Sequence, residues 1–78
     1  MPIQYKKNLA TFVDVVTVDE AEPLLNWLQE RRNAKVNLAD CSHMHPANLQ
    51  VLMASKCAVT AWPSDRPFSA MLKAALEN

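Results

Sequence analysis

Short apolar runs near the start of the chain show the pattern of paired strands. Residues 9–16 (LATFVDVV) are rich in β-branched and aromatic side chains, which predicts a strand. Residues 3–5 (IQY) predict a short edge strand, and the polar residues 6–8 between the two segments predict a turn. We therefore expect an antiparallel hairpin at one edge of a sheet.

The pattern then changes to a helical period. One alanine and three leucines recur at i, i+3, i+4 and i+7 from position 21, which predicts a helix with one apolar face. Asp19 and Glu22 have the spacing of a capping box, and Pro23 falls in the first turn, where its missing N–H costs least. Trp27 lies beside the apolar face. We interpret it as a core or boundary residue, with partial exposure as the alternative.

A strand and a helix are predicted next. Residues 35–40 read KVNLAD, and their alternating pattern predicts a strand with one face better buried than the other. Pro46 marks the start of a helix that continues to residue 55, with Ser42 or His45 as the capping residue. This helix is apolar on most sides, so we expect it to be largely covered.

The last two predicted elements are again a strand and a helix. Residues 57–62 (CAVTAW) predict the strand. Ser64 or Asp65 can cap the helix, and Pro67 falls in its first turn. The predicted buried stripe of this helix is formed by Phe68, Met71, Leu72, Ala75 and Leu76.

The order of these elements predicts an α/β fold in a single domain that spans residues 1–78. Strands separated by helices pair in parallel with right-handed crossovers, whereas the first two strands pair as a hairpin. The expected architecture is a mostly parallel four-stranded sheet with an N-terminal edge strand and three helices. We find no internal repeat, low-complexity segment or linker in the sequence.

Composition limits the classes of function. Eight basic and eight acidic residues give a formal charge of zero, which argues against a nucleic-acid or anionic-membrane surface and makes self-association, for example as a homodimer, plausible. No apolar run approaches the roughly 20 residues needed to span a bilayer, and no signal peptide is recognisable, so we expect a cytoplasmic protein without membrane insertion. Glycine is absent, which excludes the glycine-rich nucleotide-binding loops, and we expect no cofactor.

The residues that could carry chemistry gather between the third strand and the second helix. Cys41, His43 and His45 alternate in sequence, and alternate side chains of an extended segment point the same way. Thiolate and imidazole are good ligands for zinc or copper, and Asp40 could be a fourth ligand. The other interpretation is a small buried cysteine flanked by polar turn residues.

Cys41 with a neighbouring histidine is also the arrangement of a nucleophilic enzyme. A chain of 78 residues with short loops leaves little room for a substrate pocket and an oxyanion hole, so we predict no enzymatic activity. Cys57 begins the neighbouring strand at the opposite edge of the sheet. We therefore expect no disulfide between Cys41 and Cys57.

The segment from Leu38 to Leu52, LADCSHMHPANLQVL, resembles the STAS domain, the fold of anti-sigma factor antagonists and of sulfate-transporter cytoplasmic tails. Members show a strand ending in aspartate-leucine-serine, a turn reading roughly aspartate-serine-alanine/serine-glycine-leucine, and a helix. The segment 17–21, TVDEA, is similar to the opening of the first helix of the family. The element order of nearly the whole chain also agrees with the resemblance.

The sequence departs from the family pattern around the residue whose phosphorylation switches family members. Pro46 falls where relatives carry the serine or threonine that becomes phosphorylated, His45 falls at the preceding aspartate, and Asn48 falls at the glycine. Proline has no hydroxyl group and cannot accept a phosphate. Ser42 is the nearest hydroxyl and a weak candidate for phosphorylation. The resemblance therefore implies a bacterial regulatory protein that is not switched at the usual position.

The resulting hypothesis is a non-enzymatic domain that binds a protein partner, such as an anti-sigma-like kinase or another regulatory protein. The alternative is a metal- or small-ligand-binding module that uses Cys41, His43 and His45. Trp62 closes a strand that we expect to end at the same edge of the sheet as the two histidines. The predicted contact surface comprises Ser42, His43, His45, Pro46, Asn48 and Trp62.

Overall fold

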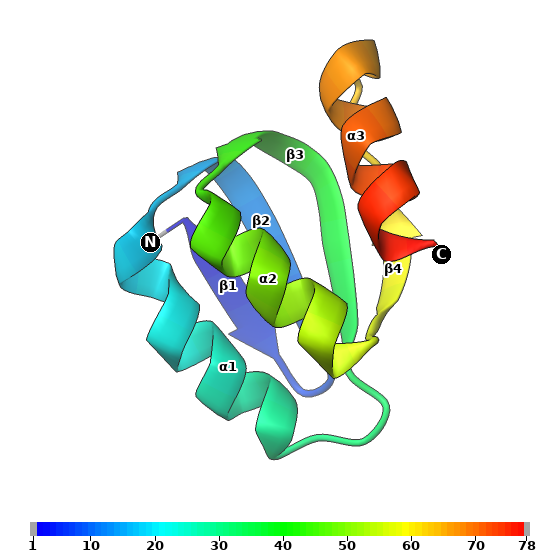
Figure 1. The fold of residues 1–78 in the computed structure, drawn as a ribbon. Helices are drawn as coiled ribbons and strands as arrows, with labels where there is room; N and C mark the ends of the chain where they lie inside the picture. Colours follow the sequence, from blue (N-terminus) through cyan, green and yellow to red (C-terminus); the bar gives the residue numbers. More distant parts are fainter. Residues whose placement is uncertain (1, 78) are drawn as a thin grey trace.

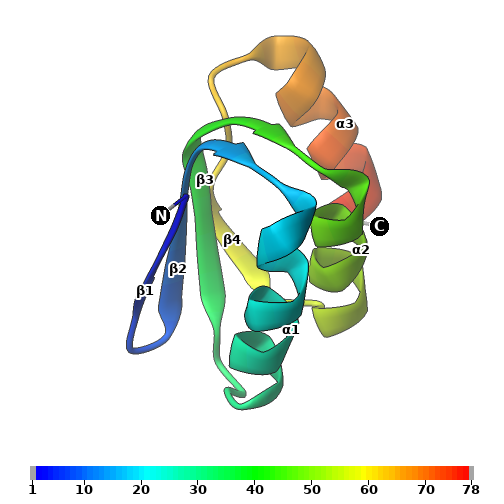
Figure 2. The ribbon, with the colours of Figure 1, turned by 90° about the vertical axis from the view of Figure 1, so that its left-hand side faces the viewer.

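A four-stranded sheet forms one layer of the protein, and helices cover one of its faces (Figures 1 and 2). The structure is a computed structural model that describes residues 2–77. It confirms the predicted α/β fold. The elements are β1 (Ile3–Lys6), β2 (Leu9–Val16), the short 3-10 helix η1 (Val18–Glu20), α1 (Ala21–Gln29), β3 (Lys35–Met44), α2 (Pro46–Ser55), β4 (Ala58–Ala61) and α3 (Arg66–Leu76).

The strands lie in the order β1-β2-β3-β4. β1 pairs antiparallel with β2, and β2, β3 and β4 pair in parallel, as the sequence predicts. Helices α1 and α2 lie side by side on one face of the sheet, and α3 follows beyond α2, next to β4 (Figures 1 and 2). None of the helices in residues 2–77 is long and apolar enough to cross a membrane.

The core lies between the sheet and the helices. Phe12, Val36 and Leu38 project from the strands and are completely buried, as are leucines from all three helices. Trp27 is only 8% exposed, with its ring 5.1 Å from that of Tyr5, so it is a core residue. Burying one such leucine or phenylalanine side chain contributes about 1.5–3 kcal/mol to stability.

The structure shows which side chains cap the first turns of the helices. The Nδ1 atom of His45 accepts a hydrogen bond of 3.0 Å from the backbone N–H of Ala47, which makes His45, not Ser42, the cap of α2. Asp65 caps α3 by accepting from the N–H of Phe68 at 3.1 Å. The predicted capping box before α1 is wrong, because the chain there forms the 3-10 helix η1 and no side chain caps α1.

Strand β3 is four residues longer than predicted. It continues past Asp40 to Met44, so the segment interpreted as a polar turn is mostly strand. Two irregularities explain the missed pattern. From Asn37 to Asp40, β3 advances by three residues while its partner β2 advances by only two. From Cys41 to His43, β3 advances by two residues while β2 advances by one. Each is a bulge on β3, and bulges break the two-residue alternation on which strand prediction depends.

Strand β4 is shorter than predicted and covers only the first part of β3. Its last pair joins Ala61 to Asn37. Beyond Asn37, β3 has no strand on that side among the described residues. Trp62 directly follows β4 and therefore lies at the level of the middle of β3. The prediction that β4 ends beside the two histidines is wrong.

Candidate functional site

The candidate site lies where β3 ends and α2 begins, at the carboxyl end of the parallel strands (Figure 1). In open α/β sheets this is the end at which ligands and partners usually bind. Four of the predicted contact residues are exposed there and follow one another closely along the chain: Ser42, His43, His45 and Pro46.

Helix α3 adds an aromatic side chain to this surface. The ring of His43 stacks near the ring of Phe68, with centroids 6.5 Å apart and an interplanar angle of 27°. Phe68 lies in the first turn of α3 and is half-buried against the core. The sequence analysis assigned Phe68 only to the buried stripe of its helix, since no local signal relates it to a histidine 25 positions earlier.

His45 holds the start of α2 in place. Its Nδ1 accepts a hydrogen bond from the N–H of Ala47 in the first turn of the helix. The backbone N–H of His45 donates to the carbonyl of Val16 at 2.9 Å, which ties the start of α2 to the end of β2. The other ring nitrogen remains available on an exposed side chain.

Asn48 is completely buried, with 0% of its surface exposed. Its Nδ2 donates to the carbonyl of Thr17 at 2.8 Å and, at 3.4 Å, to that of Val16. Its Oδ1 has no hydrogen-bond partner among the described residues. The prediction that Asn48 contacts a partner directly is therefore wrong. The side chain instead fixes the position of the surface by joining α2 to the end of β2.

Cys41 points into the core and is 3% exposed. Burial raises the pKa of its thiol, and the backbone of His43 offsets part of that rise. The thiol also donates a hydrogen bond of 3.4 Å to the backbone carbonyl of His43. The thiol therefore stays protonated at neutral pH, and a protonated thiol is neither a good nucleophile nor a metal ligand. The geometry gives no support to a Cys41 nucleophile.

The geometry of residues 2–77 gives no support to the metal alternative. The bulge between Cys41 and His43 breaks the alternation that would have aimed their side chains the same way, and one is buried while the other is exposed. Within residues 2–77, no three histidine, cysteine, aspartate or glutamate side chains gather closely enough to hold a metal ion. Cys57 is a free, half-buried thiol at the other end of β3, so it cannot complete such a site.

A groove of about 510 Å³ runs beside the second half of β3. One wall is the strand from Ala39 to Ser42, and the other is the loop that carries Ser64 and Asp65. The groove exists because β4 ends early and leaves this side of β3 without a neighbouring strand. Two carboxylates line it, those of Asp40 and Asp65, so its electrostatic character is acidic.

Trp62 is separate from the histidines. It is half-buried, and the Nζ of Lys73 lies 5.7 Å from its ring centroid in a cation–π arrangement. Since β4 ends at the level of Asn37, the tryptophan joins β4 to α3 and does not extend the surface around His43. Trp62 is therefore not part of the contact surface.

Comparisons with protein-family models, with curated proteins and with solved structures found no match.

Proposed function

We propose that this chain is a regulatory protein–protein interaction domain that binds its partner at the junction of β3 and α2. The observation that carries the proposal is the exposed group Ser42, His43, His45 and Pro46, held in a fixed position beside Phe68. Because His45 and Asn48 tie this junction to β2, a partner would meet a preorganised surface and little ordering entropy would be lost on binding.

The fold adds support from the family resemblance. The observed order of strands and helices agrees with the order that the resemblance to STAS domains implies. Pro46 is the first residue of α2, at the strand–helix junction where STAS domains carry a phosphorylatable hydroxyl. A proline there cannot be phosphorylated, so we propose binding that does not depend on modification at this position. Ser42 is exposed and stays a weak candidate for another modification.

The partner we propose is an anti-sigma-like kinase or another regulatory protein, in the cytoplasm of a bacterium. The chain itself would catalyse no reaction. The stacked pair His43 and Phe68 would supply the apolar anchor, and the acidic groove beside Asp40 would position a basic or polar side chain of the partner.

Site-specific photo-crosslinking in the native host tests the location of this surface. A photoreactive amino acid at position 42 should form a discrete crosslink to one protein. The matched control places the same group at Gln4, an exposed residue of β1 away from the junction, and should give no such product. Equal crosslinking at both positions, or none at position 42, would contradict the proposal.

A further inference from the structure

The charges of this neutral protein are segregated toward opposite ends of the fold. The turn between β1 and β2, the ends of α1 and α2 and the start of β3 meet at one end, which we call the basic end (Figure 1). Six of the eight basic residues of the chain lie there. They are Lys6, Lys7, Arg31, Arg32, Lys35 and Lys56.

Contacts within the basic end confirm that these segments meet. The Nε of Arg31 donates to the carbonyl of Lys7 at 2.7 Å, and the N–H of Lys35 donates to the carbonyl of Asn8 at 2.7 Å. The guanidinium of Arg31 also lies 4.6 Å from the ring centroid of Trp27. Of the residues that the structure describes, only Arg31 and Glu30 form an ion pair, at 3.7 Å. None of the remaining positive charges of this end therefore forms an ion pair with another residue of the range 2–77.

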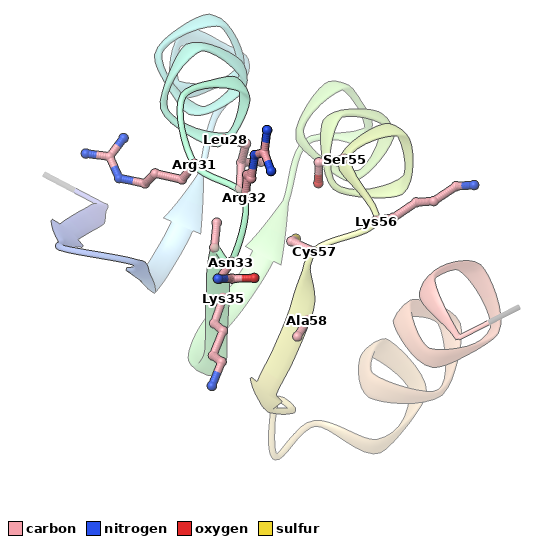
Figure 3. A pocket seen from close by; sticks show the side chains of 10 residues that line it. Leu28, Arg31, Arg32, Asn33, Lys35, Ser55, Lys56, Cys57 and Ala58 are labelled. Carbon is pink, nitrogen blue, oxygen red and sulfur yellow. The ribbon is translucent and has the colours of Figure 1, made fainter.

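Two hollows shape the basic end. One, of about 250 Å³, opens between the ends of α1 and α2 and is lined by Arg32 and Lys56 among others; Figure 3 shows their side chains directed apart around it. The other, of about 780 Å³, has Lys6 and Lys7 at its margin and the half-buried Leu9 in its lining. Both share Lys35, and neither is lined by a carboxylate.

The opposite end, which we call the acidic end, combines carboxylates with exposed apolar side chains. Val15 and Val18 are 49% and 51% exposed, and both lie next to aspartates in the sequence. The carboxylates come from the end of β2, the second half of β3 and the starts of α1 and α3. They are Asp14, Asp19, Glu20, Glu22, Asp40 and Asp65.

We propose that copies of this chain associate head to tail, with the acidic end of one copy docked on the basic end of the next. Val18 would enter the hollow beside Leu9, while Asp19 and its neighbours would meet Lys6 and Lys35. Each copy keeps one free end of each sign, so the contact is heterologous and extends into chains unless its rotation closes a ring.

The charge pattern disfavours the other arrangements. Most homodimers use a two-fold contact, but a two-fold contact centred on either end would place like charges opposite each other. A single-stranded nucleic acid would need aromatic side chains for base stacking, and no aromatic residue lines either hollow. A second copy, by contrast, offers six carboxylates and two exposed valines from the chain itself. The inference does not rest on the function proposed for the β3–α2 junction.

Sedimentation of two complementary variants tests the proposal. Lys6→Gln with Lys35→Gln removes positive charge from the basic docking surface, and Asp19→Asn with Glu22→Gln removes negative charge from the acidic one, all at exposed positions. Circular dichroism establishes that each variant is folded. Each should be monomeric alone, and an equimolar mixture should form a capped dimer of twice 8.8 kDa, because one intact basic end meets one intact acidic end. Lys6→Arg with Lys35→Arg is the matched control and should associate like the wild type.

Salt provides the second readout. Wild-type association should weaken at least about tenfold between about 20 mM and about 500 mM NaCl, since the Debye length falls below the separation of most of the paired charges. A wild-type protein that stays monomeric at low salt, a dimer insensitive to salt, or a mixture of the two variants that remains monomeric would overturn the proposal. Monomers that instead bind heparin through Lys35 would also overturn it, and would assign the basic end to an external polyanion.

Discussion

The two halves of β3 differ in almost every respect that matters for function. The first half, from Lys35 to Leu38, alternates buried and less buried residues and pairs with a strand on both sides over most of its length. The second half, from Ala39 to Met44, follows one bulge, contains another, and has a strand on one side only. The first half builds the core, and the second half presents the exposed residues of the candidate site. The regular half packs into the core, whereas the bulges of the second half turn side chains toward the surface.

The largest expected loss of stability comes from a substitution in the first, regular half of β3. Leu38 is completely buried, so Leu38→Ala should lower the free energy of unfolding by about 2–5 kcal/mol through lost burial and a cavity. Ser42→Ala in the exposed half should change it by less than about 0.5 kcal/mol. Urea unfolding followed by circular dichroism measures both. If Leu38→Ala does not fold, Leu38→Val should still show a loss of about 1 kcal/mol. Equal effects of Leu38→Val and Ser42→Ala would contradict the comparison.

A substitution of Asn48 should give the next largest loss of stability, because its side chain ties the start of α2, which follows the second half of β3, to the end of β2. Asn48→Ala removes the hydrogen bonds to the carbonyls of Thr17 and Val16, of which the Thr17 bond is part-buried and the Val16 carbonyl keeps the bond from the N–H of His45. We expect a loss of about 1–3 kcal/mol in urea unfolding. Gln50→Ala, an exposed position two residues later on the same helix, is the matched control and should be near neutral. A neutral Asn48→Ala would remove the proposed tie between α2 and β2.

His45 tests the cap of α2. His45→Ala deletes the acceptor for the N–H of Ala47 and should cost about 0.5–2 kcal/mol in thermal or urea unfolding. His45→Asn supplies another capping side chain and should restore most of the loss. Stabilities of the alanine and asparagine variants that do not differ would show that the cap contributes nothing.

The smallest expected effect concerns Cys41 and alkaline pH. Burial raises its pKa above the ordinary 9.0, so the folded state holds the thiol proton to higher pH than the unfolded state does. Stability from this group is complete below its ordinary, unfolded-state pKa of 9.0 and is lost as the pH rises toward the folded-state pKa. Unfolding curves between these limits should fall less steeply for Cys41→Ala than for the wild type.

Tyr5 adds a separate loss at higher pH. Burial also raises the pKa of Tyr5, so both proteins should lose further stability near and above pH 10. An identical slope for Cys41→Ala and the wild type would show that the buried thiol does not titrate with unfolding.

The sequence predicts the parts of this fold that obey local rules. The strand 9–16, the helix start at Pro46 and the proline in the first turn of α3 all carry a signal within a few residues, and the structure contains each of them. The same holds for the parallel pairing, because it follows from the order of the elements. Local propensity and the global fold agree throughout this part of the molecule.

The missed features depend on contacts between distant segments. The bulges of β3 arise from its pairing with β2, the short β4 leaves the acidic groove open, and Asn48 is buried because α2 packs on the end of β2. A buried asparagine and an exposed one look the same in a sequence. The approach of Phe68 to His43 likewise depends on where α3 returns to the sheet.

The most direct test of the proposed contact surface is calorimetric titration of the purified domain with the protein captured by crosslinking at position 42. His43→Ala should weaken binding at least about tenfold, since it removes half of the stacked anchor at the centre of the surface. Gln4→Ala, at an exposed position on β1, should leave the affinity unchanged. Unaltered binding by His43→Ala, or equal losses in both variants, would contradict the assignment of this surface.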